Sequence, residues 1–335
     1  MDWLVEDWFP RGNRGIDAAP EGNCKTIWGA FWDVCIAGGH DILGHKVTQG
    51  NVLIIDEETP KPMLEALLNR FSQSLGYKSY QQLPITLLSM EGFRFGRKTP
   101  LDYFLDVEKR SKPIFIRMDS YIAMLPGGRQ GLSENNSESG IAVRDNLHRM
   151  MDASPGCNTL LAAHSGKPIA QWTLEEIARH DMQDLVRGHA SLVGEACDTG
   201  FILKKLSEHP DPLRFAVQTR ARRGAVKESG NIIYVEMQEE AYGRGAAKLV
   251  QIAPLSPPPS KLAKELFKFF TAYKSYHSWQ EIAKQSALYT RKQNQLALDE
   301  LLQHKIILNH DKPFTYMLNP RYKRACDAKY IKKLT

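Results

Sequence analysis

Eight residues near the N-terminus, Ala19-Pro20-Glu21-Gly22-Asn23-Cys24-Lys25-Thr26, constrain this chain more than any other stretch. They match the phosphate-binding pattern G-x-x-x-x-G-K-[ST], except that Ala19 and Cys24 replace its outer glycines. In such a loop the backbone N–H groups surround the phosphates, Lys25 reaches the β- and γ-phosphates, and the Thr26 hydroxyl ligates Mg²⁺. The octamer therefore predicts a nucleotide site at residues 21–26. A chance Gly-x-x-Lys-Thr turn is the alternative.

The flanking residues favour the nucleotide site. Gly12-Asn13-Arg14-Gly15-Ile16 is a turn leading into a short strand, although Asp17 is an unusual strand residue. Residues 27–39 form a largely apolar helix ended by two glycines. Strand, loop and helix is the order that a phosphate-binding loop requires, and the helix adds its positive N-terminal end to the site.

Cys24 stands where glycine lets the backbone close on the phosphates. Its side chain adds bulk, and both Lys25 and the helix N-terminus favour a thiolate, which repels ATP. On this interpretation, Cys24→Gly tightens ATP binding and raises turnover. Alternatively, the side chain packs between sheet and helix, as small buried cysteines commonly do, and the substitution leaves the affinity unchanged.

Two carboxylates follow the next expected strand. Residues 51–56 are apolar and β-branched, typical of a buried parallel strand, and they lead into Glu57 and Glu58. Ligands bind α/β sheets at the carboxyl ends of the strands, so one of the two is placed to polarise a water toward the γ-phosphate. We favour Glu57. Alternatively, both belong to a helix N-cap with an acidic first turn.

A second strand, residues 113–120, ends in Asp119. An apolar run followed by a carboxylate is the arrangement that holds Mg²⁺ through water beside a phosphate-binding loop. Arg117 interrupts the apolar run. The alternative role for Asp119 is that of an ordinary turn residue.

Two further strand ends carry candidate site residues. Residues 158–163 lead into His164, which is either a contact to the γ-phosphate or a structural histidine. Residues 215–219 lead into Arg220 and Arg222. These arginines either bind nucleic acid, reach the nucleotide of a neighbouring subunit, or form a solvated basic turn. Further expected elements are helices at residues 63–75, 99–110 and 141–151, strands at 84–88 and 199–203, and a polar loop at 127–140.

The composition favours a globular protein that works in a reducing compartment. The five cysteines form no C-x-x-C pair, no run of about 18 apolar residues exists, and the acidic N-terminus is unlike a signal peptide. We therefore expect a cytoplasmic protein without a zinc ribbon or a transmembrane helix.

The distribution of charged residues and prolines indicates two domains. Residues 261–335 hold 15 Lys and Arg against 6 Asp and Glu, a net charge of +9, whereas the remainder has 29 against 32, a net charge of −3. We expect one domain at residues 1–253, a proline-rich linker at 254–261 and a second domain at 262–335. The basic excess indicates a nucleic-acid partner, and a solvated basic surface is the alternative.

The second domain has the pattern of a winged helix–turn–helix. Helices are expected at residues 262–273, from 278 onward and at 290–304, and the strands 306–308 and 314–318 follow as a hairpin. The third helix would present Arg291, Lys292, Gln293 and Asn294 to the major groove of DNA. Such domains also mediate protein contacts, which is the alternative.

The ordered series of motifs resembles the RecA-like P-loop ATPases, and among them the RepA-type replicative helicases, over residues 1–250. The resemblance rests on Trp8-Phe9-Pro10-Arg11-Gly12 before the loop, on the Asp119-Ser120 strand end, and on Glu134-Asn135-Asn136-Ser137. The run Glu57-Glu58-Thr59-Pro60 is similar to that of KaiC-type relatives. The Lys-x-Arg pair of the family is matched by Arg220-Ala221-Arg222.

Other motifs of the family are matched in part. The Arg-Gly-Ser segment is similar to Arg187-Gly188-His189, and the paired His before Gly-Lys is matched by His164 and Lys167, with Ala163 in place of the first His. The resemblance implies an α/β fold with a parallel-rich sheet flanked by helices. It also implies a hexameric ring that binds ATP and Mg²⁺ between subunits and holds single-stranded DNA in its channel.

These features predict a DNA-dependent ATPase, a replication helicase or DNA motor of a mobile element, plasmid or phage. Glu57 is the expected base, Thr26 and Asp119 hold Mg²⁺, and Arg220 or Arg222 stabilises the transition state in a neighbouring subunit. The alternative function is a nucleotide-gated DNA-binding switch or loader with little or no hydrolysis, which the substitutions at Ala19 and Cys24 favour.

Overall fold

The computed structural model describes most of the N-terminal three quarters of the chain and short parts of the rest. The described residues are 2–95, 98–125, 137–165, 172, 176–177, 180, 185, 197–207, 212–221, 231–241, 244–252, 277–278, 298, 307–309 and 315–318. The chain separates into two compact units, Met1–Pro254 and Leu255–Thr335.

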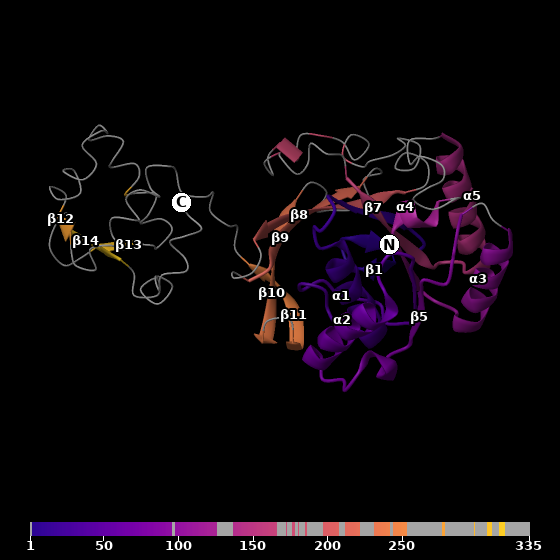
Figure 1. The fold of residues 1–335 in the computed structure, drawn as a ribbon, viewed down its shortest axis with the longest axis horizontal. Helices are drawn as coiled ribbons and strands as arrows, with labels where there is room; N and C mark the ends of the chain where they lie inside the picture. Colours follow the sequence, from indigo (N-terminus) through magenta and orange to yellow (C-terminus); the bar gives the residue numbers. More distant parts are fainter. Residues whose placement is uncertain are drawn as a thin grey trace. The chain divides into compact units, whose positions relative to one another are not determined.

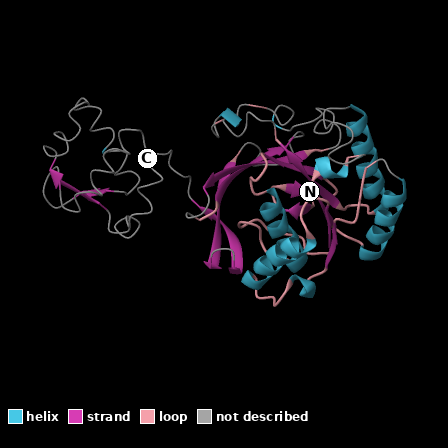
Figure 2. Cartoon of the chain, in the orientation of Figure 1, coloured by secondary structure: helices cyan, strands magenta, loops and turns pink. Residues whose placement is uncertain are grey.

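The first unit is built on a nine-stranded sheet with the order β11-β10-β9-β8-β3-β7-β6-β4-β5 (Figures 1 and 2). Six neighbouring strands, from β8 to β5 in this order, run parallel, and β9, β10 and β11 continue the sheet antiparallel. The parallel strands are β3 (Arg14–Ala19), β4 (Val52–Asp56), β5 (Ile85–Ser89), β6 (Phe115–Asp119), β7 (Asn158–His164) and β8 (Thr199–Ser207). The antiparallel strands are β9 (Arg214–Ala221), β10 (Ile232–Ala241) and β11 (Arg244–Ile252).

Helices cover both faces of this sheet. The helices α1 (Lys25–Gly38) and α2 (Lys61–Ser74) lie within its curve, and α3 (Lys98–Ser111) and α5 (Ser137–Ala153) lie on the opposite side (Figure 1). Val52 and Ile54 belong to one hydrophobic core, whereas Leu53 and Ile55 belong to the other. This alternation explains the continuous apolar run, because a parallel strand is buried on both faces. The expected α/β fold with a parallel-rich sheet is confirmed.

Aromatic side chains fix α1 to the sheet and to the N-terminal segment. Two short paired strands, β1 (Trp3–Val5) and β2 (Phe9–Pro10), begin the chain. Trp8 stacks on Trp32 of α1 with ring centroids 6.3 Å apart, and Trp32 meets the edge of Phe201 at 5.1 Å. Large aromatic rings contribute much of the burial energy of a core. The position of α1, and with it the phosphate-binding loop, is therefore set by this cluster.

The structure departs from the expected elements at two places. The helix α5 begins at Ser137, within the stretch expected to be a polar loop. The hairpin of β10 and β11 was not expected, although Ile233, Val235 and Met237 are buried at alternate positions, as in a half-buried strand. Polar residues lie between these buried positions, so the sequence of β10 contains no long continuous apolar run that would indicate a strand. The helix α2 packs against β11, and its Arg70 forms an ion pair with Glu239 of β10.

The second unit contains an antiparallel sheet of three short strands. These strands, β12 (His277–Ser278), β13 (Ile307–Asn309) and β14 (Thr315–Leu318), lie in the order β12-β14-β13. The two expected strands at 306–308 and 314–318 coincide with β13 and β14 to within a residue, and β12 is additional. The expected helices of this unit lie almost wholly outside the described residues. In the described parts of the chain, no helix is both long and apolar enough to span a membrane.

Candidate nucleotide-binding and hydrolysis site

The predicted phosphate-binding residues form the loop between β3 and α1 and the first turn of α1. Gly22 takes a left-handed conformation with φ of 73°, and nothing lies within 4 Å of the place of a Cβ there. Glu21 is exposed at the loop. The Asn23 Oδ1 accepts a hydrogen bond of 2.8 Å from the backbone N–H of Lys205, which joins the loop to β8. The loop is therefore held open toward solvent on one side and anchored on the other.

Cys24 takes the left-handed conformation that the missing glycine would have adopted. Its φ is 68° and its ψ is 9°, immediately before the first residue of α1. The side chain is 8% exposed and belongs to the core that contains Trp28. The two alternatives for Cys24 are a side chain that faces the phosphates and one that packs in the core. In the structure the side chain packs in the core. The backbone conformation costs about 1 kcal/mol for a residue with a Cβ.

We expect Cys24→Gly to leave nucleotide affinity unchanged, because the side chain lies in the core. Relief of the left-handed strain and loss of the buried side chain oppose each other, so the free energy of unfolding changes by no more than about 1 kcal/mol. Calorimetric titration with ADP and thermal unfolding measure the two quantities. Much tighter binding by the glycine variant, together with protection of Cys24 from alkylation by ATP, would show that the thiol faces the phosphates.

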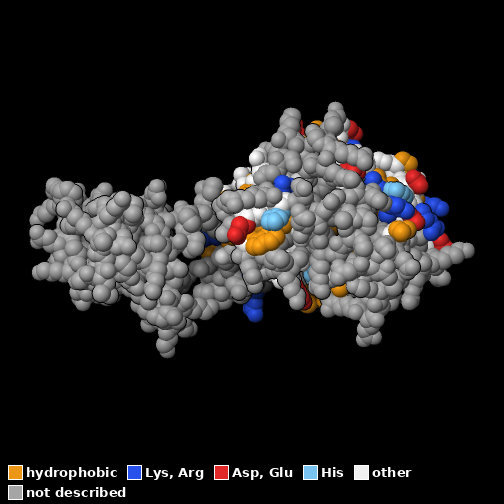
Figure 3. All heavy atoms as spheres, turned by 90° about the horizontal axis from the view of Figure 1, so that it is seen from above, with side chains coloured by type: hydrophobic (Ala, Val, Ile, Leu, Met, Phe, Trp, Pro, Cys, Tyr) orange, Lys and Arg blue, Asp and Glu red, His pale blue; other side chains and the backbone are white. Residues whose placement is uncertain are grey.

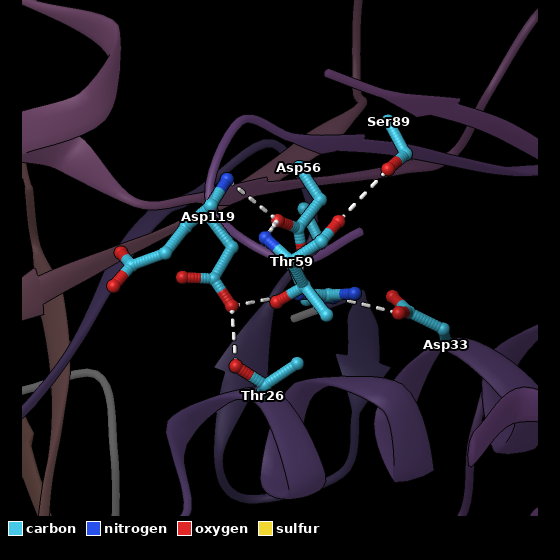
Figure 4. A network of polar contacts seen from close by, with 8 residues as sticks. Thr26, Asp33, Asp56, Thr59, Ser89 and Asp119 are labelled. Atoms are coloured by element: carbon cyan, nitrogen blue, oxygen red, sulfur yellow. Dashed lines mark hydrogen bonds and ion pairs between the residues drawn. The ribbon is translucent and has the colours of Figure 1, made fainter. Parts of the chain in front are cut away.

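The start of α1 meets the end of β6. The Thr26 hydroxyl donates a hydrogen bond of 2.9 Å to Oδ2 of Asp119 (Figure 4). Lys25 is 8% exposed, and its Nζ donates to the carbonyl of Ala19 at 3.4 Å. The two residues that the sequence predicts for Mg²⁺ are thus in direct contact beside the predicted phosphate lysine.

Asp56, expected from the sequence only as the end of a strand, organises the turn after β4. Its Oδ1 accepts hydrogen bonds from the backbone N–H groups of Glu58 at 2.9 Å and Thr59 at 2.6 Å. Asp56 lies directly beside Asp119 in the parallel register (Figure 4). Burial and the charge of Asp119 raise the pKa of Asp56 to about 7.

Glu57 and Glu58 have different surroundings. The Glu57 side chain is 2% exposed and accepts three hydrogen bonds, from the N–H of Gly92 at 3.1 Å, the N–H of Phe93 at 3.0 Å and Arg94 Nη1 at 3.0 Å. Both of its oxygens are therefore engaged by the segment after β5. Glu58 is less buried, and its charge acts on His164.

His164 lies at the end of β7, in register with Ala19 at the start of the loop. Burial and the charge of Lys25 lower the pKa of His164, while Glu58, Glu21 and Asp119 act in the opposite direction. The lowered pKa favours the neutral imidazole. The carboxyl ends of β3, β4, β6 and β7 thus bring together the predicted site residues Lys25, Thr26, Glu58, Asp119 and His164.

Of the two arginine candidates at the end of β9, the structure describes Arg220 but not Arg222. Arg220 is on β9, and its Nη2 donates to the backbone carbonyls of His180 at 3.0 Å and Ile177 at 3.3 Å. Within this chain it therefore holds the segment that contains these two residues. Arg222 and the four DNA-binding candidates Arg291, Lys292, Gln293 and Asn294 lie outside the described residues, and their roles stay predictions.

Sequence reasoning missed a buried group of charges behind the loop. Arg117 Nε lies 2.6 Å from Asp33 Oδ2, and Arg117 Nη1 lies 3.3 Å from Asp119 Oδ2 and 4.0 Å from Asp56 Oδ2. Burial, together with Asp119, raises the pKa of Asp17 to about 7. The signal was visible, because Asp17, Asp33 and Arg117 are charged residues within otherwise apolar runs.

The donor set fits Mg²⁺. A hydroxyl and a carboxylate, Thr26 and Asp119, are the hard oxygen ligands that this ion prefers. The described residues contain no cage of three or more His, Cys, Asp or Glu side chains. That agrees with the usual mode of Mg²⁺ binding, in which the protein supplies one or two groups and the phosphates and water supply the rest.

The strand order, with β7 between the loop strand β3 and the Asp119 strand β6, and the site at its carboxyl end define a RecA-like P-loop ATPase. The AAA_25 family model, described as an AAA domain, matches residues 1–170, and the chain belongs to this family. A comparison with curated protein sequences finds no match.

Two solved structures illustrate the likeness of folds. A KaiC-like protein of Pyrococcus horikoshii OT3 is similar over 75% of this chain and 94% of its own, with a TM-score of 0.47 and 15% identity. The flagellar accessory protein FlaH of Methanocaldococcus jannaschii is similar over 74% and 91%, with a TM-score of 0.45 and 10% identity.

Proposed function

We propose that this chain is a DNA-dependent ATPase that serves as a replication helicase or DNA motor. The observation that carries the ATPase part is the hydrogen bond of Thr26 to Asp119 beside Lys25, at the carboxyl end of the sheet. This arrangement couples the loop that binds phosphates to the carboxylate that holds the metal ion. Membership of the AAA_25 family supports the same conclusion.

Each predicted site residue has a separate role in the proposed binding and hydrolysis of ATP. Lys25 binds the β- and γ-phosphates, and Thr26 and Asp119 hold Mg²⁺, which neutralises charge on the phosphates when bound. Glu58 would be the general base for the attacking water, which is supported by the hydrogen bond from its backbone N–H to Asp56 and by the effect of its charge on His164. His164, at the carboxyl end of β7 in register with Ala19, would donate a hydrogen bond to the γ-phosphate. Arg220 or Arg222 of a neighbouring subunit in a ring, proposed as a hexamer, would complete the site.

The DNA part of the proposal rests on the second unit. In the proposed winged helix, β13 and β14 would form the wing hairpin and β12 would pair with it, which the strand order β12-β14-β13 supports. Residues 261–335 carry the net charge of +9. On the first unit, by contrast, basic and acidic side chains lie side by side at the right of the view (Figure 3). One such pair in this unit is Arg149 with Asp102, at 3.7 Å.

Removal of the second unit is expected to weaken binding to duplex DNA and to flatten its salt dependence. Every DNA phosphate that the protein no longer neutralises reduces the slope of log K against log salt by about 0.9. The variant ends at Pro254, since the sheet and both hydrophobic cores lie before that residue. Fluorescence anisotropy at several salt concentrations measures the slope, and ADP binding by the truncated chain controls for its folding. Equal DNA affinity and slope in both chains would assign the second unit to protein contacts.

A nucleotide-gated DNA-binding switch without rapid hydrolysis is the second candidate. The specific observation in its favour is that both oxygens of Glu57 are taken by Gly92, Phe93 and Arg94. An attacking water would have to compete with these three donors for the Glu57 oxygens. If Glu58 does not replace it as the base, the site binds ATP and releases it unchanged.

A further inference from the structure

A buried arginine stands in the centre of the strand that ends at Asp119. Arg117 is 1% exposed, and its neighbours Ile116 and Met118 are completely buried. Because side chains alternate along a strand, Arg117 and Asp119 share the face covered by α1. Arginine is almost never buried without a partner, so this position calls for an explanation.

The helix α1 is shaped around the arginine side chain. A Cβ on Gly29 would lie 2.5 Å from Arg117 Cδ, closer than real Cβ contacts allow. Four residues later, Asp33 contributes the carboxylate that lies 2.6 Å from Arg117 Nε. Gly29 thus makes room for the aliphatic stem and Asp33 receives the guanidinium. The three residues form one unit of packing and charge.

Two links join α1 to β6, and Arg117 connects them. One link is the hydrogen bond from Thr26 to Asp119 at 2.9 Å (Figure 4). The other is the ion pair of Asp33 with Arg117 at 2.6 Å. Arg117 Nη1 also donates to Asp119 Oδ2 at 3.3 Å. Thr26 and Arg117 therefore bond to the same oxygen of Asp119. These two donors fix the orientation of the carboxylate and leave its other oxygen directed away from them.

We propose that Arg117 is a positioning residue for the metal ion, an inference that rests on the proposed ATPase function. It orients Asp119 against Thr26 before nucleotide binds, and through Asp33 it ties that orientation to the helix that carries Lys25 and Thr26. Arginine suits this task because its planar fork spans two carboxylates and keeps its charge when buried. Partners that orient a metal ligand typically change metal affinity by about 10- to 100-fold.

The test must separate orientation from charge and from folding. Removal of Arg117 alone leaves Asp33, Asp56 and Asp119 together without their counter-ion, which strongly destabilises a buried site. The double variant Arg117→Met/Asp33→Asn removes one positive and one negative charge and keeps side chains of similar size. Its net charge equals that of the wild type, so a change in Mg²⁺ affinity reflects the orientation of Asp119.

A second ion pair offers a matched control. Arg70 on α2 and Glu239 on β10 are mostly buried, with side chains 16% and 18% exposed, and they likewise join a helix to a strand of the same sheet. Neither residue belongs to the proposed site. Arg70→Met/Glu239→Gln therefore reproduces the loss of a helix–strand ion pair without touching Asp119.

Calorimetric titration of the full chain with ADP is repeated at increasing Mg²⁺ concentrations. The measured quantity is the Mg²⁺ concentration at which the increase in ADP affinity is half complete. We expect Arg117→Met/Asp33→Asn to need about 10- to 100-fold more Mg²⁺ than the wild type. ADP affinity in the presence of a chelator should stay unchanged, since Lys25 and the loop are intact. The control should show the wild-type Mg²⁺ requirement.

If the double variant does not fold, Arg117→Lys serves as a second variant, because it keeps the positive charge. We expect Arg117→Lys also to need more Mg²⁺ than the wild type, since lysine cannot bridge Asp33 and Asp119. A wild-type Mg²⁺ requirement in either folded variant overturns the inference, as does an equal shift in the Arg70 control. If ADP binding by the wild type itself ignores Mg²⁺, the proposed function fails together with the inference.

Discussion

Glu58→Gln is expected to lower ATP turnover by at least about 100-fold while ATP and Mg²⁺ still bind, the usual size of a general-base effect. Glu58 follows the buried Asp56, which fixes its backbone, and its charge reaches His164 at the end of β7. Glutamine preserves the size of the side chain and removes the proton acceptor. Single-turnover hydrolysis and binding of a non-hydrolysable ATP analogue separate the chemical step from affinity.

Glu57→Gln is the matched control. Its carboxylate accepts from Gly92, Phe93 and Arg94, and an amide can accept at only one of its two terminal atoms. We therefore expect a loss of stability of about 1–3 kcal/mol, the usual penalty for buried groups left unsatisfied, with a smaller loss of turnover than in Glu58→Gln. If Glu57→Gln abolishes hydrolysis and Glu58→Gln does not, the prediction from the sequence holds and Glu57 must leave its three donors during catalysis.

Lys25→Ala is expected to weaken ATP binding by about 100-fold, which corresponds to roughly 3 kcal/mol for a charged hydrogen-bond donor. Lys25 is nearly buried at the start of α1, where its Nζ is 3.4 Å from the carbonyl of Ala19. A phosphate that displaces this carbonyl gains both the charge of the lysine and the positive end of the helix.

Lys46→Ala provides the comparison for loss of a lysine elsewhere. Lys46 pairs with Asp41 at 2.7 Å on the surface, and such exposed pairs contribute little. ATP affinity should remain at the wild-type value in Lys46→Ala. Equal affinities in Lys25→Ala and the wild type would remove the loop from the nucleotide site.

The sequence was sufficient for those parts of the fold that depend on local pattern. The apolar runs before Asp56, Asp119 and His164 are strands, since each is buried on both faces of the sheet. Their order in the chain, combined with the loop at residues 19–26, predicted which side chains meet at one edge. In the structure, Thr26 contacts Asp119, which is 93 residues away in the chain.

The sequence was insufficient where a side chain could lie in either of two nearby environments. Glu57 and Glu58 are adjacent, and only the position of the Gly92 and Phe93 N–H groups shows which carboxylate is engaged. Cys24 fits either the phosphates or the core until its surroundings are known. Arg117 appeared as an interruption of an apolar run because its partner Asp33 lies 84 residues away.

The most direct test of the proposed function is steady-state ATP hydrolysis by the full chain with Mg²⁺, in the presence and absence of single-stranded DNA. The contact between Thr26 and Asp119 and the position of Glu58 predict Mg²⁺-dependent release of phosphate, and the basic second unit predicts stimulation by DNA. Hydrolysis absent under both conditions, in a chain that still binds ATP, would contradict the proposed function and favour the nucleotide-gated switch.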